Sequence, residues 1–175
     1  NLSTINDSAN FQGASINGYM WSIDSGRITS LSPNPSVVFD SSGTYEVVLI
    51  STSDRDCQDT LVRTITIWDR PTAIVEVDSA CLGTPTFIDD QSQYVVSPSR
   101  WDFRFGDNND TTLRPPLSFP IDYTYGQPGT YGLTMIVTDA NGCTDTAEHD
   151  AIVLDLPQPA FTTSEICSED STLFI

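Results

Sequence analysis

Four cysteines are the residues of this chain whose type and spacing most directly suggest chemistry. Cys57 and Cys81 are 24 residues apart, and so are Cys143 and Cys167. The matching separations predict two disulfides, Cys57–Cys81 and Cys143–Cys167, each joining one structural unit to the next across a proline-containing joint. A disulfide that closes a loop of this length contributes about 3–4 kcal/mol in the chain-entropy model. Buried free thiols are the alternative. Zinc is disfavoured because the chain has no Cys-x-x-Cys motif and only one histidine.

Carboxylates are the second group with possible chemistry. They gather in three short segments, Asp54 to Asp59, Asp89-Asp90 and Asp107 to Asp110. Oxygen-rich loops of a β-sandwich can hold calcium, and Asp89, Asp107 and Asp110 are the candidate ligands, although no EF-hand spacing is present. Aspartates of this kind more often cap turns through hydrogen bonds to the backbone. Calcium is therefore the one cofactor considered, and otherwise we expect none.

Catalysis has little support in the sequence. The only histidine, His149, falls in a segment predicted to be a strand, and a Ser-His-Asp or Cys-His site would have to use it. No serine lies in a nucleophile-elbow motif. Sugar hydrolysis would need a pair of carboxylates, and no pair stands out in so acidic a chain. We therefore expect no enzyme activity.

The overall charge excludes several classes of partner. The 175 residues include 24 Asp and Glu against 7 Arg and no Lys, which gives a net charge of −17. Such a surface repels nucleic acid and anionic membranes. No apolar run is long enough to span a membrane. There is no signal peptide, although the cysteines suggest export, so the sequence reads as an excerpt of a longer protein or as a mature form.

One strand–turn–strand segment occurs twice and organises the chain. In its second copy, Tyr131 to Thr138 alternate as a strand with one face in a core. Asn141-Gly142 then favours a hairpin turn, because both residues tolerate a positive φ. The first copy starts at Gly43-Thr44-Tyr45, 86 residues earlier. The same displacement relates Cys57 to Cys143, Pro71 to Pro157 and Cys81 to Cys167. A chain that repeats its hairpins is built from copies of one unit.

Composition and turn spacing predict β-sandwich units, because Thr, Ser, Val and Ile are plentiful and no helical periodicity is present. The expected strands are residues 19–23, 37–39, 45–51, 60–68, 73–77, 86–89, 101–105, 121–125, 131–138 and 151–154. Trp21 and Trp101 stand at core-facing positions. We therefore expect both in the core rather than on a sugar-binding surface.

The repeat divides the chain into three parts. Residues 1–70 are predicted to form a unit that lacks its first strand, and residues 71–157 a complete unit. Residues 158–175 repeat the opening of the second unit and predict the first strand of a following one. The chain would then be a window on a longer tandem array. The alternative is strand exchange, in which residues 158–175 are donated to the first unit of an identical subunit.

These motifs resemble those of the PKD domain, an immunoglobulin-like β-sandwich. Trp101 and Phe105-Gly106-Asp107-Asn108 are similar to the Trp-x-Phe-Gly-Asp-Gly turn of that family, with two additional residues and Asn in place of the last Gly. Pro128-Gly129-Thr130-Tyr131 matches its Pro-Gly-Thr-Tyr strand opening, and Ser42-Gly43-Thr44-Tyr45 is a more degenerate copy. The resemblance implies an all-β chain of tandem immunoglobulin-like (PKD-type) β-sandwiches.

Gly142 to Thr146 and Cys81-Leu82-Gly83 further look like the tandem PKD repeats of large surface adhesins of gliding and biofilm-forming Bacteroidota. That resemblance implies a structural and adhesive segment, secreted or at the cell surface, that forms a stiff stalk or filament. Its partners would be neighbouring domains of the array or identical subunits, together with surface glycans or other cells. The alternative is a non-catalytic binding module of a secreted polysaccharide- or protein-degrading enzyme.

A short pattern is similar to the O-glycosylation signal of exported Bacteroidota proteins. It consists of Asp, then Ser or Thr, then a small or apolar residue. The candidate acceptors are Ser8, Thr60, Ser79, Thr111, Thr146 and Ser171. The other interpretation is that these Asp-Ser and Asp-Thr pairs belong to the repeat framework and start strands.

Overall fold

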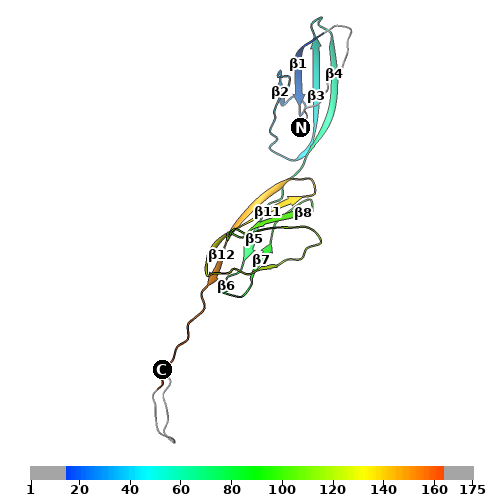
Figure 1. Cartoon of the computed structure of the whole chain (residues 1–175). Coiled ribbons are helices and arrows are strands. Elements are labelled where there is room, and N and C mark those ends of the chain that lie inside the picture. Colours follow the sequence, from blue (N-terminus) through cyan, green and yellow to red (C-terminus); the bar gives the residue numbers. More distant parts are fainter. Residues whose placement is uncertain (1–14, 164–175) are drawn as a thin grey trace, which may run out of the picture. The chain divides into compact units, whose positions relative to one another are not determined.

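The computed structural model describes residues 15–163, and every regular element in that range is a β-strand (Figure 1). The predicted all-β fold is confirmed. The same range contains no helix of the length and apolar character needed to cross a membrane. The chain divides into two compact units, residues 1–69 and 70–175. This division lies one residue before the boundary expected from the repeat.

The described part of the first unit is one antiparallel sheet. Its strands are β1 (Ile16–Ile23), β2 (Ile28–Ser30), β3 (Gly43–Ser53) and β4 (Gln58–Ile67), in the spatial order β2-β1-β3-β4. Successive side chains of a strand point to opposite faces. Trp21, Ile23 and Val47 therefore share one face, where they are the buried hydrophobic residues of this unit.

The strand predicted at Val37–Phe39 is wrong, since residues 31–42 contain no strand. Pro33 and Pro35 lie in this segment, and proline cannot donate the backbone hydrogen bond that a β-ladder needs. The segment still packs on the sheet. Val37 and Phe39 are partly buried against its core, and the Phe39 ring centroid lies 4.6 Å from that of Tyr45.

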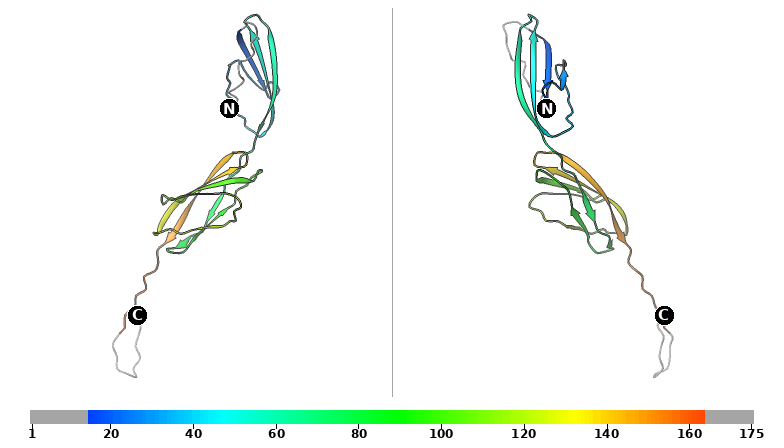
Figure 2. Two further views of the ribbon diagram at one scale, coloured as in Figure 1. Left: turned by 45° about the vertical axis from the view of Figure 1, so that its right-hand side comes forward. Right: turned by 180° about the vertical axis from the view of Figure 1, so that it is seen from behind.

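The second unit is a sandwich of two sheets (Figure 2). Its strands are β5 (Val75–Val77), β6 (Ala80–Cys81), β7 (Thr86–Asp90), β8 (Pro98–Arg104), β9 (Asp110–Leu113), β10 (Ile121–Tyr123), β11 (Gly129–Asp139) and β12 (Thr144–Leu154). The small sheet has the order β10-β7-β5, and the large sheet has the order β6-β12-β11-β8-β9. Neighbouring strands are antiparallel except β6 and β12, which run parallel.

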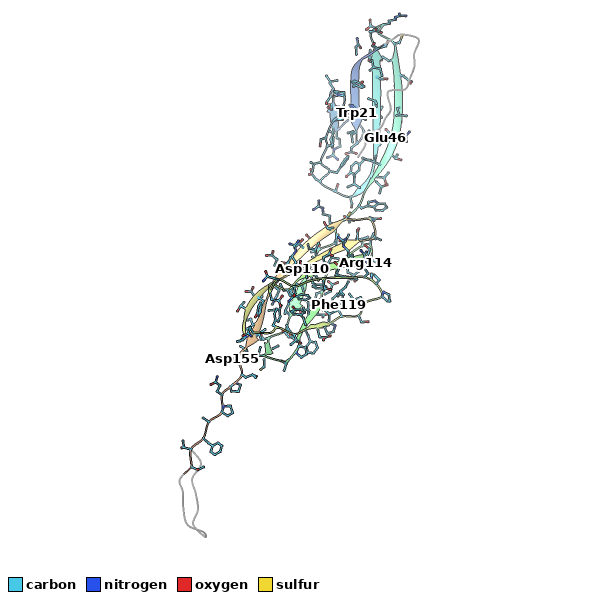
Figure 3. The ribbon with its side chains drawn as sticks, viewed as in Figure 1. Trp21, Glu46, Asp110, Arg114, Phe119 and Asp155 are labelled. Atoms are coloured by element: carbon cyan, nitrogen blue, oxygen red, sulfur yellow. The ribbon has the colours of Figure 1, made fainter. Side chains whose placement is uncertain are left out.

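The core of the second unit lies between these sheets. Alternation along β11 turns Leu133, Met135 and Val137 inward, and each is fully buried. Burying an aliphatic side chain of this size contributes about 1.5–3 kcal/mol. Trp101 is also buried, and Phe119 packs edge-on against it at 5.5 Å (Figure 3). Trp21 and Trp101 therefore both lie in cores, as the sequence predicts.

The repeated hairpins share one turn geometry. In the second unit, the Asp139 carboxylate accepts hydrogen bonds from the backbone N–H groups of Asn141 and Cys143, at 2.9 and 2.8 Å. In the first unit, the Ser53 hydroxyl accepts from the N–H of Cys57 at 3.1 Å. A residue with positive φ precedes the cysteine in each turn: Gly142 at 87° and Asp56 at 61°. The predicted hairpin at Asn141-Gly142 is confirmed.

Candidate functional site

A glycine sets the turn that follows β8. The backbone N–H of Phe105 donates to the carbonyl of Asn109 at 3.0 Å and closes the turn. Gly106 has a φ of +82°, a conformation that residues with a Cβ rarely adopt. A Cβ at this position would also lie 2.7 Å from the carbonyl oxygen of Gly132 on β11. Only glycine fits this position without displacing the backbone of the large sheet.

Four aromatic rings, which we call the aromatic cluster, extend from this turn toward β11. Phe105 stacks on Tyr123 with ring centroids 3.7 Å apart, and Tyr125 stacks on Tyr131 at 4.2 Å. Tyr123 and Tyr125 meet edge-on at 4.8 Å and so join the two stacks. Tyr125 is only 2% exposed, and its hydroxyl donates to the carbonyl of Phe105 at 3.0 Å. The cluster therefore links the turn to β10 and β11.

Asp107 attaches to the aromatic cluster through its carboxylate. The Tyr123 hydroxyl donates to it at 2.7 Å, and the Asn109 side-chain amide and backbone N–H donate at 3.0 and 3.1 Å. Burial disfavours the charged carboxylate, but these hydrogen bonds outweigh burial, so the pKa of Asp107 lies below its usual value. Asp107 is therefore an ionised turn cap at neutral pH.

The two central tyrosines are held neutral. Burial, and then the hydrogen bond to the Asp107 carboxylate, raise the pKa of Tyr123. Burial, and then the negative charge of Asp107, raise the pKa of Tyr125 to about 12. General bases and nucleophiles need the opposite shift, toward the working pH. The chemistry of the aromatic cluster is therefore that of a structural network.

The three candidate calcium ligands differ in their surroundings. Asp89 on β7 accepts from the side chain of Gln91 at 2.6 Å, Asp107 caps its turn, and Asp110 is exposed at the start of β9 (Figure 3). Within residues 15–163, no group of three or more His, Cys, Asp or Glu side chains is arranged to hold a metal ion. Of the three, Asp107 caps a turn through the backbone N–H of Asn109, which is the other interpretation of such residues.

Cys57 and Cys81 lie far from the joint at residues 68–71. Cys57 precedes β4, whose ten residues span about 34 Å before the first unit ends. Cys81 pairs with Leu154 at the end of β12, whereas Ala73 donates its backbone N–H to Asp145 at the start of β12. Cys81 is thus at the opposite end of the second unit from its first residues. A disulfide between Cys57 and Cys81 would not clamp the joint itself.

The structure contains Cys57, Cys81 and Cys143 as free thiols, so it lacks the expected Cys57–Cys81 disulfide. Cys57 and Cys81 are exposed rather than buried, and Cys143 is half-buried. The alternative of buried free thiols therefore does not describe Cys57 or Cys81. Cys167 lies outside the described residues, and its pairing with Cys143 stays a prediction.

The candidate glycosylation residues are accessible where the structure describes them. Thr60, Ser79 and Thr146 are exposed, and Thr111 on β9 is half-buried. Two of the preceding aspartates bond to backbone: Asp59 accepts from the N–H of Thr60, and Asp145 from that of Ala73. These hydrogen bonds fit the interpretation that the Asp-Ser and Asp-Thr pairs belong to the repeat framework. The exposed hydroxyls are also accessible enough to carry a sugar. Ser8 and Ser171 lie outside the described residues.

His149 lies on the exposed side of β12. Its Nδ1 atom is 3.0 Å from the carbonyl oxygen of Asp150. An open hollow beside it is lined by Gly132, Leu133, Thr134, Glu148, His149 and Asp150. This lining has no serine or cysteine that the histidine could activate. The described surroundings of His149 do not form the Ser-His-Asp or Cys-His site that hydrolysis would need.

Comparison with known families identifies the second unit. Residues 68–154 match the family model of the PKD domain. Residues 68–154 are a PKD domain. Gly106 and Asp107 of this domain belong to the turn that resembles the PKD motif in the sequence. Tyr131, from the Pro-Gly-Thr-Tyr motif, lies in the aromatic cluster. No catalytic domain is found, and no curated protein matches the chain.

Solved structures that are similar to this chain come from several bacterial proteins. The PKD1 domain of the Vibrio cholerae metalloprotease PrtV is 22% identical, with a TM-score of 0.42, over 49% of this chain and 99% of that one. Fibronectin(III)-like modules of Clostridium thermocellum CbhA are 12% identical, with a TM-score of 0.47, over 82% and 80%. A 1.5-MDa bacterial ice-binding adhesin is 12% identical, with a TM-score of 0.39, over 90% and 59%.

Sequence reasoning missed three residues of the PKD domain. The sequence predicts Tyr123 and Tyr125 only as part of a strand, and it assigns Asp139, which follows the strand predicted at residues 131–138, no role. For Asp139 a signal existed, because an aspartate two residues before Asn-Gly can accept turn N–H groups. The Tyr123–Asp107 hydrogen bond joins residues 16 positions apart on different elements, and no local pattern reports such a contact.

Proposed function

We propose that the chain is a structural and adhesive segment of a bacterial extracellular or cell-surface repeat protein, built from tandem PKD-like units. The observation that carries this proposal is the repetition of one hairpin with its supports. In each unit, a tyrosine in the first long strand donates to the carbonyl four residues earlier, Tyr45 to Ser41 and Tyr131 to Gln127, both at 2.9 Å. Duplicated framework contacts of this kind are typical of repeat arrays.

The chemistry of the PKD domain supports a framework role. Asp107 and Asp139 cap turns, Tyr123 and Tyr125 are held neutral, and the hollow beside His149 has no serine or cysteine in its lining. The acidic surface, with 24 Asp and Glu against 7 Arg, suits a solvated exterior that does not bind nucleic acid. The chain would then form part of a stiff stalk or filament that extends from the cell and attaches it to other surfaces. Its partners would be neighbouring units, identical subunits or surface glycans.

Two measurements test this function. Small-angle X-ray scattering of residues 1–175 should give a maximum dimension close to the summed length of two sandwiches, and a value near that of one sandwich contradicts a stiff stalk. Beads coated with the chain should adhere to bacterial cells or to glycan arrays more than beads coated with an acidic protein of similar charge. Binding confined to one insoluble polysaccharide would instead favour a binding module of a secreted enzyme.

A further inference from the structure

The outer faces of the two sheets of the PKD domain differ in charge. The sheets pack on each other through their inner faces, so their outer faces point in opposite directions (Figure 2). The chain has seven arginines and no lysine, and three of the arginines, Arg100, Arg104 and Arg114, belong to the β8–β9 side of the large sheet. The strands of the small sheet contain acidic residues but no arginine. The two faces of one domain therefore have complementary charges.

The arginine face consists of Arg100, Arg104 and Arg114. The first two alternate in β8 with buried aromatic residues and therefore point outward, and Arg114 follows β9 and is exposed (Figure 3). Arg100 forms an ion pair with Asp102 at 2.8 Å. Asp110 is the register partner of Arg104, but no ion pair joins them. In the described part of the chain, Arg104 and Arg114 thus have no carboxylate partner.

The acidic face, formed by Glu76, Asp78, Asp89 and Asp122, surrounds an exposed aromatic ring on the small sheet. Phe87 on β7 is 47% exposed. Its register partner on β10 is Asp122, and on its other side its carbonyl accepts from the backbone N–H of Asp78 at 3.1 Å. Adjacent strands are about 4.8 Å apart, so these two carboxylates flank the ring. Asp89 and Glu76 face each other one step further along. None of the four carboxylates has an ion-pair partner among the described residues.

An arginine side chain fits the acidic face. A guanidinium group stacks on an aromatic ring, and its N–H groups donate to carboxylates beside that ring. Arginine is also more weakly hydrated than lysine, so less hydration is lost when it enters a contact. Because the chain has no lysine, arginine is the cation that a second copy would supply. The arginine face offers two arginines that no described carboxylate already binds.

We propose that the PKD domains of two copies of this chain associate side by side, with the arginine face of one copy against the acidic face of the other. Arg104 of one copy lies on Phe87 of the other, between Asp78 and Asp122, and Arg114 reaches Glu76. The proposal concerns only residues of the PKD domain and does not depend on the function proposed above.

Other charges of the PKD domain limit where the two faces meet. Glu148 and Asp150 lie on the β12 side of the large sheet's outer face, as the register partners of Thr134 and Gly132. These carboxylates repel the acidic face of a second copy, so the contact is confined to β8 and β9. The net charge of −17 also repels, but about 0.15 M salt screens repulsion beyond about 8 Å, and close pairs then decide the outcome.

Sedimentation equilibrium of the chain tests the contact. Because the contact joins two different faces, it is heterologous, and association should continue past a dimer as the concentration rises. Raising NaCl from about 0.05 M to about 0.5 M should weaken association. The arginine-face variant combines Arg104→Glu with Arg114→Glu. The acidic-face variant combines Asp78→Arg with Asp122→Arg. Each variant should associate about tenfold or more weakly than the parent, because like charges then meet.

Mixing the two variants shows whether the faces meet each other. The acidic-face variant still has an intact arginine face, and the arginine-face variant still has an intact acidic face. An equimolar mixture should therefore associate about as strongly as the parent, although neither variant does so alone.

Matched charge reversals in the first unit serve as controls. Arg55→Glu with Arg63→Glu, and Asp40→Arg with Asp54→Arg, change the net charge by the same amounts at exposed positions. Association of both controls should stay within about twofold of the parent. All variants should keep the far-UV circular dichroism of the parent, since the changed residues are exposed.

Three results would overturn the proposal. One is a parent chain that stays monomeric up to about 1 mM at low salt. Another is a mixture of the two face variants that remains monomeric, since the two faces then do not meet. The third is a monomeric parent that binds a carboxylated polysaccharide and loses this binding in the arginine-face variant, because a glycan rather than a second copy then occupies the arginine face.

Discussion

Gly106 lies against Gly132 so closely that a Cβ on Gly106 would sit 2.7 Å from the carbonyl oxygen of Gly132. The contact joins the turn after β8 to β11, the central long strand of the PKD domain. It depends on the absence of a side chain on Gly106 and on its φ of +82°. The glycine of the PKD turn is thus required by packing as well as by backbone conformation.

Gly106→Ala should destabilise the PKD domain by about 3 kcal/mol, because overpacking against backbone adds to the strain of a positive φ. Urea denaturation followed by tryptophan fluorescence measures the change. Two controls separate the causes. Gly83→Ala has a similar φ of +86° in open space and should cost about 1 kcal/mol, and Gly126→Ala, with open space and no positive φ, should cost less than about 0.5 kcal/mol. Equal effects at Gly83 and Gly106 would contradict the role of the Gly132 contact.

Tyr123→Phe should destabilise the PKD domain by about 1 kcal/mol at neutral pH, because it removes the hydroxyl that donates to Asp107. The pKa of Asp107 is lowered in the folded state, so the stability it contributes is present above pH 3.8 and is lost as the pH falls through the folded value. The difference between parent and variant should therefore shrink below pH 3.8. Urea titrations at several pH values check this, and a difference that persists unchanged at pH 2 would contradict it.

The parent chain should lose stability as the pH rises from about 10 to about 12. The pKa of Tyr125 is raised to about 12, so the unfolded chain releases this proton near pH 10 while the folded chain retains it. Tyr125→Phe should cost about 1–2 kcal/mol at pH 7, because the hydrogen bond to Phe105 is lost, but should flatten the alkaline decline. Tyr94→Phe, at a position 47% exposed, serves as the control and should keep the parent profile.

Asp56→Gly should stabilise the first unit by about 0.5–1 kcal/mol. Asp56 has a φ of 61° at the hairpin position where the second unit has Gly142, and glycine adopts this conformation without a Cβ penalty. The reciprocal change, Gly142→Ala, should destabilise the PKD domain by about 1 kcal/mol. Urea denaturation of each variant gives both values. A destabilising Asp56→Gly would mean that the aspartate side chain holds the turn.

Local patterns predicted the elements that depend on local chemistry. The alternation from Tyr131 to Thr138 and the Asn141-Gly142 turn both report nearest-neighbour preferences, and both are confirmed. The strand predicted at Val37–Phe39 is wrong because the prediction gave too little weight to the prolines just before it. Strand β2 (Ile28–Ser30) was not predicted.

Contacts between distant elements could not be predicted in this way. The equal spacing of the cysteines predicted two disulfides, but the structure has Cys57, Cys81 and Cys143 as free thiols. The spacing also could not report the end of the unit at which each cysteine lies, because strand direction decides that. Asp107 was identified as acidic and therefore as a candidate calcium ligand. Its carboxylate instead accepts from Tyr123 on β10, a partner that only the fold brings near it.

The path of the chain through the PKD domain has a mechanical consequence. Ala73 is bonded beside the start of β12, and the chain leaves the domain at Leu154, at the other end of the same strand. Tension applied at these two points acts along β12, whose neighbours β11 and β6 are hydrogen-bonded to it across that direction. The bonds are then sheared together rather than peeled one after another. Rupture requires many of these hydrogen bonds to break at once. The resistance of the domain to tension therefore comes from the orientation of its strands rather than from covalent links.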